Sequence, residues 1–343
     1  MSGIPDFTPV VLLTGFLGSG KTTLLARLLR DPALSDTAVL INEFGEVGLD
    51  HHLLDRIDDT MVLLSSGCLC CTIRGELSDA IKGLHSRRAR GEVPPFRRIV
   101  IESTGLADPL PVIATITADP VLKHHFRMGA VVTTVDAVNG LDQLARQPES
   151  VTQAAVADRL VLTKTDLCAP ATTHAVVAAL RPLNPDAPLI LARTAALDAD
   201  VILGEQTALS TTTAALRCVA SPDPGAPGSA HGDAVSSFSL VAEGPLDWTL
   251  FGLWLTMLLN RHGTRILRVK GLLNVEGSET PVAIHGVQQL VHVPSHLSAW
   301  PDDDRRSRLV FITRGLDPRR IERSMAAFGL LREASALAGR LSR

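Results

Sequence analysis

A glycine-rich segment near the start of the chain contains the residue types that bind nucleotide phosphates. The apolar run VVLL leads into Gly15, four residues separate Gly15 from Gly20-Lys21-Thr22, and a leucine-rich helical pattern follows. Glycines let backbone N–H groups wrap phosphate oxygens, and a helix that begins at the loop directs its positive end at the anion. Lys21 would reach the β and γ phosphates, and the Thr22 hydroxyl would ligate Mg²⁺. This order of strand, loop and helix predicts a phosphate-binding loop rather than a chance glycine-rich turn.

A second apolar run, RRIVI, ends at residues suited to the γ-phosphate and its magnesium. Glu102 follows the run, and Gly105 comes three residues later. An acidic side chain at this place could hold Mg²⁺, and a glycine amide could contact the γ-phosphate. Glu102 stands where Asp is more usual, so the alternative is a carboxylate at a strand end with no special role.

A third apolar run, RLVL, ends in Thr163-Lys164-Thr165-Asp166, which resembles the guanine-recognition motif of GTPases. In that motif the carboxylate accepts hydrogen bonds from N1–H and the 2-amino group of the base. Adenine lacks this pair of donors, so the motif favours GTP over ATP. A surface KTD alone would be weak evidence, but its position after a strand and downstream of the phosphate loop strengthens the prediction.

Three of the five cysteines, Cys68, Cys70 and Cys71, lie close together after the run TMVLLSS. Thiolates are soft ligands that suit zinc and similar cations such as cobalt. A loop that curls at Gly67 could supply up to three ligands and leave a fourth position open. Three candidates for that position precede the cysteines in the sequence: Glu46, His51 and His52.

Other interpretations of the cysteines remain. They could be buried and unreactive, or Cys70 and Cys71 could form a redox pair, although a disulfide between adjacent cysteines is strained. The isolated Cys168 and Cys218 are assigned to packing.

The elements that must position these residues form two patterns. Up to about Gly204, seven short apolar runs alternate with helical patterns, which predicts an α/β fold with a mostly parallel sheet: PVVLLTG, TAVLIN, TMVLLSS, RRIVIES, GAVVTTVDA, RLVLTK and APLILA. The proline- and glycine-rich residues 221–232 are typical of a linker. We expect a nucleotide-binding domain at residues 1–217, a linker at 218–235 and a smaller α+β domain at 236–343.

The second domain is expected to have a largely antiparallel sheet and two amphipathic helices. The predicted strands are SSFSLVAEG, ILRVKGLLNVEG, VAIHGVQQLVHV and RSRLVFITRG, and the predicted helices span Asp247–Arg261 and Asp317–Leu331. It has no cysteine, so we expect client recognition or an accessory role there rather than chemistry.

Composition excludes several classes of protein. Lys and Arg number 33 against 36 Asp and Glu, a net charge of -3, which offers no electrostatic footprint for nucleic acid or an anionic membrane. No apolar stretch approaches the ~20 residues that a bilayer requires, and no secretory signal is recognisable. We therefore expect a cytoplasmic protein with no nucleic-acid partner and no membrane partner.

The order of GFLGSGKTTLL, NEFGEVGLD, GCLCC, ESTGLADP and TKTDL resembles the CobW-type GTPases, a family of metallochaperones that includes zinc-transferring members. The later stretch from RILRVKGLLNVEG to RSRLVFITRGLD is similar to that family's C-terminal domain. The resemblance implies a protein that depends on GTP and Mg²⁺, carries Zn²⁺ or another divalent metal such as Co²⁺, and delivers it to a client metalloprotein. Many members have a histidine-rich segment between the domains, whereas the linker here contains only His231.

The resemblance also assigns residues. A switch segment corresponds to residues 42–50, the metal site to Cys68, Cys70 and Cys71 with Glu46 as a candidate ligand, and guanine recognition to Lys164 and Asp166. The phosphate loop is assigned to Gly15, Gly18, Ser19, Gly20, Lys21, Thr22 and Thr23.

In the expected mechanism, GTP and magnesium order the switch and gather the thiolates, and hydrolysis releases the metal. Lys21 and Glu102 would serve the catalytic step, and Glu46 and Arg74 are candidates for orienting water. No residue is firmly assigned to that role, so slow hydrolysis without a client is expected. A nucleotide-gated adaptor with a structural metal is the open alternative, whereas TKTD disfavours a small-molecule kinase.

Overall fold

The computed structural model describes residues 7–44, 61–66, 72–192, 198–204 and 234–331. The chain divides into two units, residues 1–206 and 207–343. The linker expected at 218–235 lies almost wholly outside the described residues, so its bounds stay a prediction. Within the described residues, no helix is long and apolar enough to cross a membrane.

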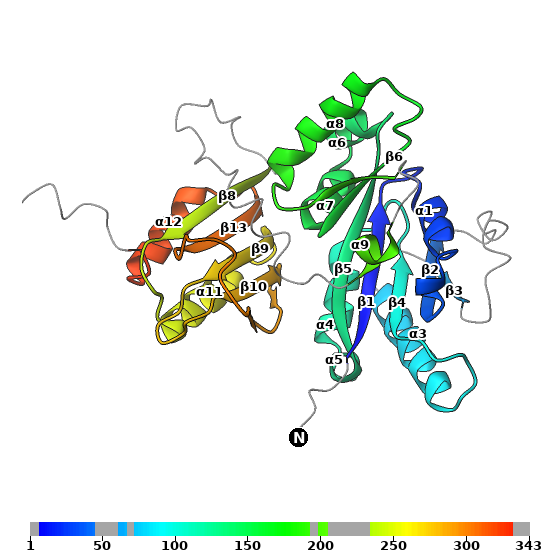
Figure 1. The fold of residues 1–343 in the computed structure, drawn as a ribbon, viewed down its shortest axis with the longest axis horizontal. Coiled ribbons are helices and arrows are strands. Elements are labelled where there is room, and N and C mark those ends of the chain that lie inside the picture. Colours follow the sequence, from blue (N-terminus) through cyan, green and yellow to red (C-terminus); the bar gives the residue numbers. More distant parts are fainter. Residues whose placement is uncertain (1–6, 45–60, 67–71, 193–197, 205–233, 332–343) are drawn as a thin grey trace, which may run out of the picture. The chain divides into compact units, whose positions relative to one another are not determined.

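The first unit contains a seven-stranded sheet in which every neighbouring pair is parallel, with the order β3-β2-β4-β1-β5-β6-β7 (Figure 1). All seven expected strands are present, and the α/β class is confirmed. The strands are β1 (Thr8–Gly15), β2 (Thr37–Phe44), β3 (Met61–Ser66), β4 (Arg98–Glu102), β5 (Phe126–Asp136), β6 (Arg159–Thr163) and β7 (Leu189–Leu191).

Helices cover both faces of this sheet, as the buried strands require. The described helices are α1 (Lys21–Leu28), α3 (Thr72–Ala89), α4 (Pro109–Ala118), α5 (Leu122–His125), α6 (Gly140–Arg146), α7 (Pro148–Val156), α8 (Pro170–Leu183) and α9 (Ala199–Leu203), with a short 3₁₀ turn at Pro32–Leu34. Val161 of β6 belongs to the same core cluster as residues of α1 and α9, whereas its neighbours Leu160 and Leu162 belong to a cluster with α7 and α8. Because side chains alternate along a strand, these two clusters lie on opposite faces of the sheet.

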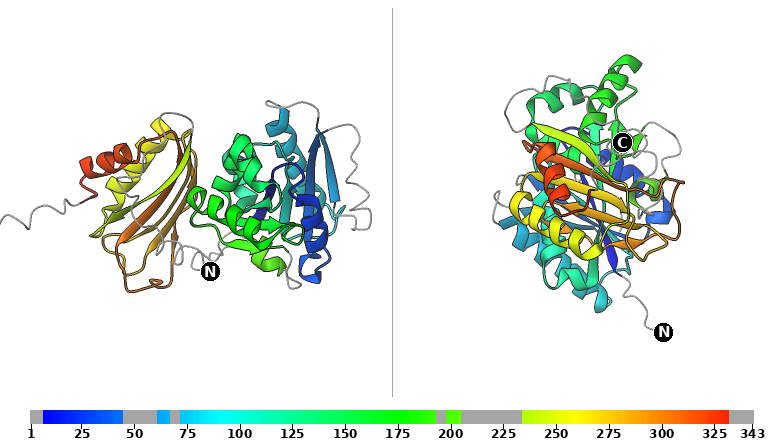
Figure 2. Two further views of the ribbon diagram at one scale, coloured as in Figure 1. Left: turned by 90° about the horizontal axis from the view of Figure 1, so that it is seen from above. Right: turned by 90° about the vertical axis from the view of Figure 1, so that its left-hand side faces the viewer.

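The second unit contains an antiparallel sheet of order β11-β10-β9-β13-β8, with β12 paired to β10. Its strands are β8 (Val235–Ala242), β9 (Ile266–Leu273), β10 (Val282–Val287), β11 (Leu290–Val291), β12 (Ser295–His296) and β13 (Ser307–Arg314). Helices α11 (Trp248–His262) and α12 (Pro318–Ala327) pack on one face, around Trp254 and Phe311 (Figure 2). The expected α+β architecture is confirmed.

Aspartates fix where several helices begin. Asp108, Asp247 and Asp317 each accept a hydrogen bond from a backbone N–H in the first turn of α4, α11 and α12. An aspartate at this position satisfies an N–H group that has no partner inside the helix. The sequence therefore located the starts of α11 and α12 to within a residue.

Two predictions for the second unit were wrong in detail. The run VAIHGVQQLVHV is not one strand, because Gln288 has φ 53° and reverses the chain into the β10–β11 hairpin. The last helix was expected to reach Leu331, but α12 ends at Ala327, and Gly329 follows with φ 71°. A glycine in the left-handed conformation commonly ends a helix, and that signal outweighs the apolar pattern beyond it.

Candidate nucleotide and metal site

The predicted phosphate loop joins the carboxyl end of β1 to the start of α1. Gly15 has φ 141°, and a Cβ there would lie 2.3 Å from the Thr134 hydroxyl on β5, so only glycine fits. Gly18 and Gly20 also have positive φ values, of 70° and 88°. The buried Lys21 side chain turns back over the loop, and its Nζ donates to the carbonyls of Gly15 (3.0 Å) and Phe16 (3.2 Å). The ammonium group of Lys21 thus lies at the centre of the loop.

Two neighbouring strands fasten this loop. The hydroxyls of the buried Ser19 and of Thr134 share a hydrogen bond of 2.6 Å, and Thr163 at the end of β6 donates to the Ser19 carbonyl at 2.7 Å. The first residue of the TKTD motif therefore supports the phosphate loop directly. Thr23, the third residue of α1, is exposed.

Glu102 and Thr22 meet beside the loop, although 80 positions separate them in the chain. The Thr22 hydroxyl donates to Glu102 Oε1 at 2.5 Å, and the Glu102 side chain is buried at the end of β4. A carboxylate and a hydroxyl are hard oxygen donors, which Mg²⁺ uses together with substrate phosphates. The residues present at this position therefore fit a magnesium ion.

Lys164 makes an ion pair that no local pattern in the sequence indicates. Its Nζ donates to Asp136 Oδ2 at 2.8 Å, and its backbone has φ 56°. Burial alone would raise the pKa of Asp136, but hydrogen bonds from Lys164, Asn139 and the Val138 amide bring the pKa below its ordinary value. The charged Asp136, which ends β5, thus fixes the first half of the predicted guanine motif.

Asp166, the second residue predicted to recognise guanine, lies two residues after Lys164 and is exposed. Asp136 was missed because a single aspartate at the end of GAVVTTVDA has no distinguishing pattern. The strand register places it beside Thr163, the residue that begins the motif.

The loop after β4 is held close to the phosphate loop. A Cβ on Gly105 would lie 2.5 Å from the Leu17 backbone nitrogen, so the two loops can approach only because residue 105 is glycine. The buried Gln153 of α7 donates through Nε2 to the carbonyls of Gly105 and Ala107, each at 3.1 Å. Gln153 was also missed, since no local motif relates it to residues 48 positions away.

The predicted metal ligands Cys68, Cys70, Cys71 and Glu46 lie outside the described residues, as do His51 and His52. Among the described residues, no group of three or more His, Cys, Asp or Glu side chains could hold a metal. The flanking elements are described: β2 ends at Phe44, β3 ends at Ser66, and these two residues are partners in the parallel ladder. The two strands that precede Glu46 and the thiols in the sequence therefore end side by side.

Two family models match most of the chain. Residues 9–191 match the CobW/HypB/UreG nucleotide-binding domain, and residues 235–329 match the cobalamin synthesis protein CobW C-terminal domain. The chain belongs to the CobW/HypB/UreG family. Membership in this family confirms the resemblance inferred from the motifs and explains the two-unit architecture.

Relatives of this CobW-family chain carry names that refer to zinc. The zinc chaperone YjiA of Escherichia coli is 32% identical over 94% of this chain and 98% of its own length. A zinc-regulated GTPase metalloprotein activator of Schizosaccharomyces pombe is 36% identical, over 47% of this chain and 40% of its own. The crystal structure of Zn(II)-bound YjiA from E. coli matches with a TM-score of 0.70 and 27% identity, over 96% of this chain and all of that one.

Proposed function

We propose that the chain is a GTP-hydrolysing metallochaperone that carries zinc at Cys68-Leu69-Cys70-Cys71 and delivers it to a client metalloprotein. The relatives named as zinc chaperones and as a metalloprotein activator support this proposal. The client would be an apoprotein whose site accepts the metal, and Co²⁺ or another divalent ion is an alternative cargo.

The position of Glu102 is the observation that carries the proposal. Strand β4 lies between β1 and β2, and Glu102 is the register partner of Leu13 on β1 and of Ile41 on β2. On one side its carboxylate accepts from Thr22 at the phosphate loop. On the other side lies the strand that leads to the proposed ligand Glu46. Glu102 therefore lies on the strand next to β2, the strand that precedes the proposed ligand Glu46 in the sequence.

The residues around the loop suggest how GTP would be held. Lys21 would exchange its two carbonyl partners for β- and γ-phosphate oxygens, and the loop amides would bind the same anion. Magnesium would be held by Thr22 and Glu102, and it neutralises charge on the phosphate oxygens. Asp166 would recognise guanine, and the Lys164–Asp136 ion pair would fix the backbone that presents Asp166.

We further propose that hydrolysis is slow without a client. Glu46 and the Arg74 side chain, the candidates for orienting water, lie outside what the structure describes. Gln153 is buried and already donates to Gly105 and Ala107, which suits a supporting role better than contact with water. A client that supplies a missing group would accelerate the reaction, as an arginine finger does by ~10³–10⁵ in other GTPases.

Zinc titration of the GTP-bound and GDP-bound protein tests the proposal. We expect tighter zinc binding with GTP and magnesium, and by linkage zinc must tighten GTP binding by the same factor. Transfer to an apo-metalloprotein should then follow hydrolysis. Equal zinc affinity in both nucleotide states would leave no basis for nucleotide-driven release, and would favour an adaptor with a structural metal instead.

A further inference from the structure

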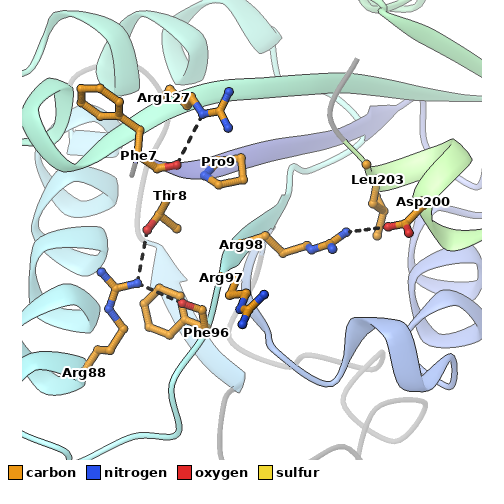
Figure 3. A pocket seen from close by; sticks show the side chains of 11 residues that line it. Phe7, Thr8, Pro9, Arg88, Phe96, Arg97, Arg98, Arg127, Asp200 and Leu203 are labelled. Carbon is orange, nitrogen blue, oxygen red and sulfur yellow. Dashed lines mark hydrogen bonds and ion pairs between the residues drawn. The ribbon is translucent and has the colours of Figure 1, made fainter. Parts of the chain in front are cut away.

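A cavity of about 800 Å³ lies at the amino ends of the central strands of the first unit (Figure 3). Its walls come from the starts of β1, β4 and β5, the last turn of α3, and α9. Parallel strands begin at one edge of a sheet and end at the other, so this cavity is at the edge opposite the phosphate loop. Strand β1 has eight residues, which corresponds to a separation of about 23 Å.

The cavity is lined by four arginines, Arg88, Arg97, Arg98 and Arg127, and by one acidic residue, Asp200. Among the described residues, arginines therefore outnumber acidic residues in the lining by four to one. Outside the lining, Asp36 lies 3.6 Å from Arg97. Guanidinium groups are thus concentrated at this cavity although the whole chain has a net charge of -3.

Arg88 is fixed at the cavity wall by neutral groups. It donates to the Thr8 hydroxyl (3.2 Å) and the Phe96 carbonyl (3.0 Å), and its guanidinium lies 4.4 Å from the centre of the Phe96 ring. A third contact joins it to His85 Nδ1 at 3.2 Å, and burial, with the nearby His125 and Arg88, lowers the pKa of His85. None of these partners is a carboxylate, so they orient the Arg88 charge without neutralising it.

Arg98 is mostly buried, and its ion pair is weak. Among the residues that the structure describes, Nη1 has no hydrogen-bond partner, and it lies 3.5 Å from the carboxylate oxygen Oδ1 of Asp200 (Figure 3). The Asp200 side chain is 67% exposed, so water weakens its attraction for Arg98. A buried donor that makes no hydrogen bond is costly, and a bound anion that accepted one from Nη1 would remove that cost. Arg97, in contrast, is exposed and able to reorient.

We propose that this cavity binds a small phosphorylated anion, at a site separate from the nucleotide site. The arginines come from α3, from the start of β4 with the residue before it, and from β5, so they line the cavity on more than one side (Figure 3). A phosphate group presents oxygens tetrahedrally to several guanidinium groups at once, whereas a carboxylate has two coplanar oxygens that one guanidinium can satisfy. The volume suits a ligand of metabolite size.

Calorimetric titration of the full chain with inorganic pyrophosphate tests this site. The titration is run in magnesium-free buffer, with and without saturating GDP, and a parallel series uses citrate. We expect pyrophosphate to bind whether or not GDP is present, and more tightly than citrate. Arg98→Gln should weaken pyrophosphate binding at least tenfold, as about 1.4 kcal/mol of lost interaction would do, and Arg97→Gln about threefold.

Arg146→Gln is the matched control, because Arg146 is an exposed arginine of the same unit, outside the cavity lining, and pairs only with Asp142 in the described contacts. It should leave the affinity within about twofold. Unfolding midpoints verify that Arg98→Gln is folded, and the exposed Arg97 gives an independent variant. The proposal is overturned if GDP abolishes pyrophosphate binding, if the Arg97 and Arg98 variants bind like the wild type, or if citrate binds more tightly. The first of these outcomes would place the anion in the phosphate loop and leave the proposed GTPase function intact.

Discussion

The two sheets of this protein differ in how they distribute polar residues. In the first unit all seven strands run in one direction, so Gly15, Glu102, Asp136 and Thr163 end their strands at one edge. In the second unit neighbouring strands run in opposite directions, and their ends alternate between two edges. A parallel sheet therefore gathers residues from distant parts of the sequence into one site, as open α/β folds generally do.

In the second unit, by contrast, large aromatic side chains and a buried ion pair contribute to the packing of the core. Trp254 of α11 is buried against Phe251 and Phe311, and its Nε1 donates to the Ser324 hydroxyl of α12 at 3.0 Å. The buried Arg308 of β13 forms an ion pair with Asp302 at 3.2 Å. The contrast suggests that nucleotide and metal chemistry belong to the first unit, and each prediction below tests that assignment.

The largest effect is expected from replacing Cys68, Cys70 and Cys71 together by serine. Without thiolates, zinc affinity should fall by about 1,000-fold or more, or roughly 4 kcal/mol. GTP affinity should stay within about tenfold. Zinc and GTP titrations of the same preparation measure both quantities. Tight zinc binding by the triple variant would place the metal at other ligands. The assignment of metal chemistry to the first unit would then lose its basis.

Lys21→Ala should weaken GTP binding by about 100-fold, or roughly 2.7 kcal/mol. The substitution removes the ammonium group that donates to the loop carbonyls of Gly15 and Phe16 and would reach the phosphates. Nucleotide titration measures the loss, and the unfolding midpoint serves as the control for folding. Unchanged affinity would refute the phosphate-loop assignment.

Asp136→Asn should weaken the binding of guanine nucleotides about tenfold. The neutral amide cannot make the charge-assisted hydrogen bond that the carboxylate accepts from Lys164. The effect should be equal for GTP and xanthosine triphosphate, since Asp136 supports the motif without contacting the base. Direct titration with both nucleotides measures it. A change in base preference would show that Asp136 itself reads the base.

Asp166→Asn is the complementary variant, and it should change preference rather than overall affinity. An amide can donate to the 2-oxo group of xanthine, which replaces the 2-amino group of guanine. The ratio of xanthine to guanine nucleotide affinity should rise about tenfold, a change of roughly 1.4 kcal/mol. A competition assay with both triphosphates would reveal an unchanged ratio, and that result would count against guanine recognition by TKTD.

The smallest effect is expected from a truncation after Ala220, which removes the second unit. GTP and zinc affinities of the folded truncated protein should stay within about threefold of the full chain, or roughly 0.65 kcal/mol. Loss of tight zinc binding in a truncated protein that retains GTP binding would show that the second unit supplies a ligand. Transfer to a client should fall, if that unit recognises clients.

The sequence alone determined the seven strands of the first sheet, the phosphate loop and most elements of the second unit. These features are local: alternating apolar residues, glycines at fixed spacing and aspartates at helix starts act over a few neighbours in the chain. The same local reasoning was wrong where a single residue reversed the chain at Gln288, and where Gly329 followed the end of the last helix.

Only the tertiary structure decided which distant residues meet. The strand order places β4 between β1 and β2, and so brings Glu102 to Thr22; it also places Asp136 beside the TKTD motif. At the opposite edge it gathers Arg88, Arg97, Arg98 and Arg127, which look like scattered basic residues in the sequence. The order of strands is set by burial of side chains against helices on both faces of the sheet, a property of the whole fold that no short segment encodes.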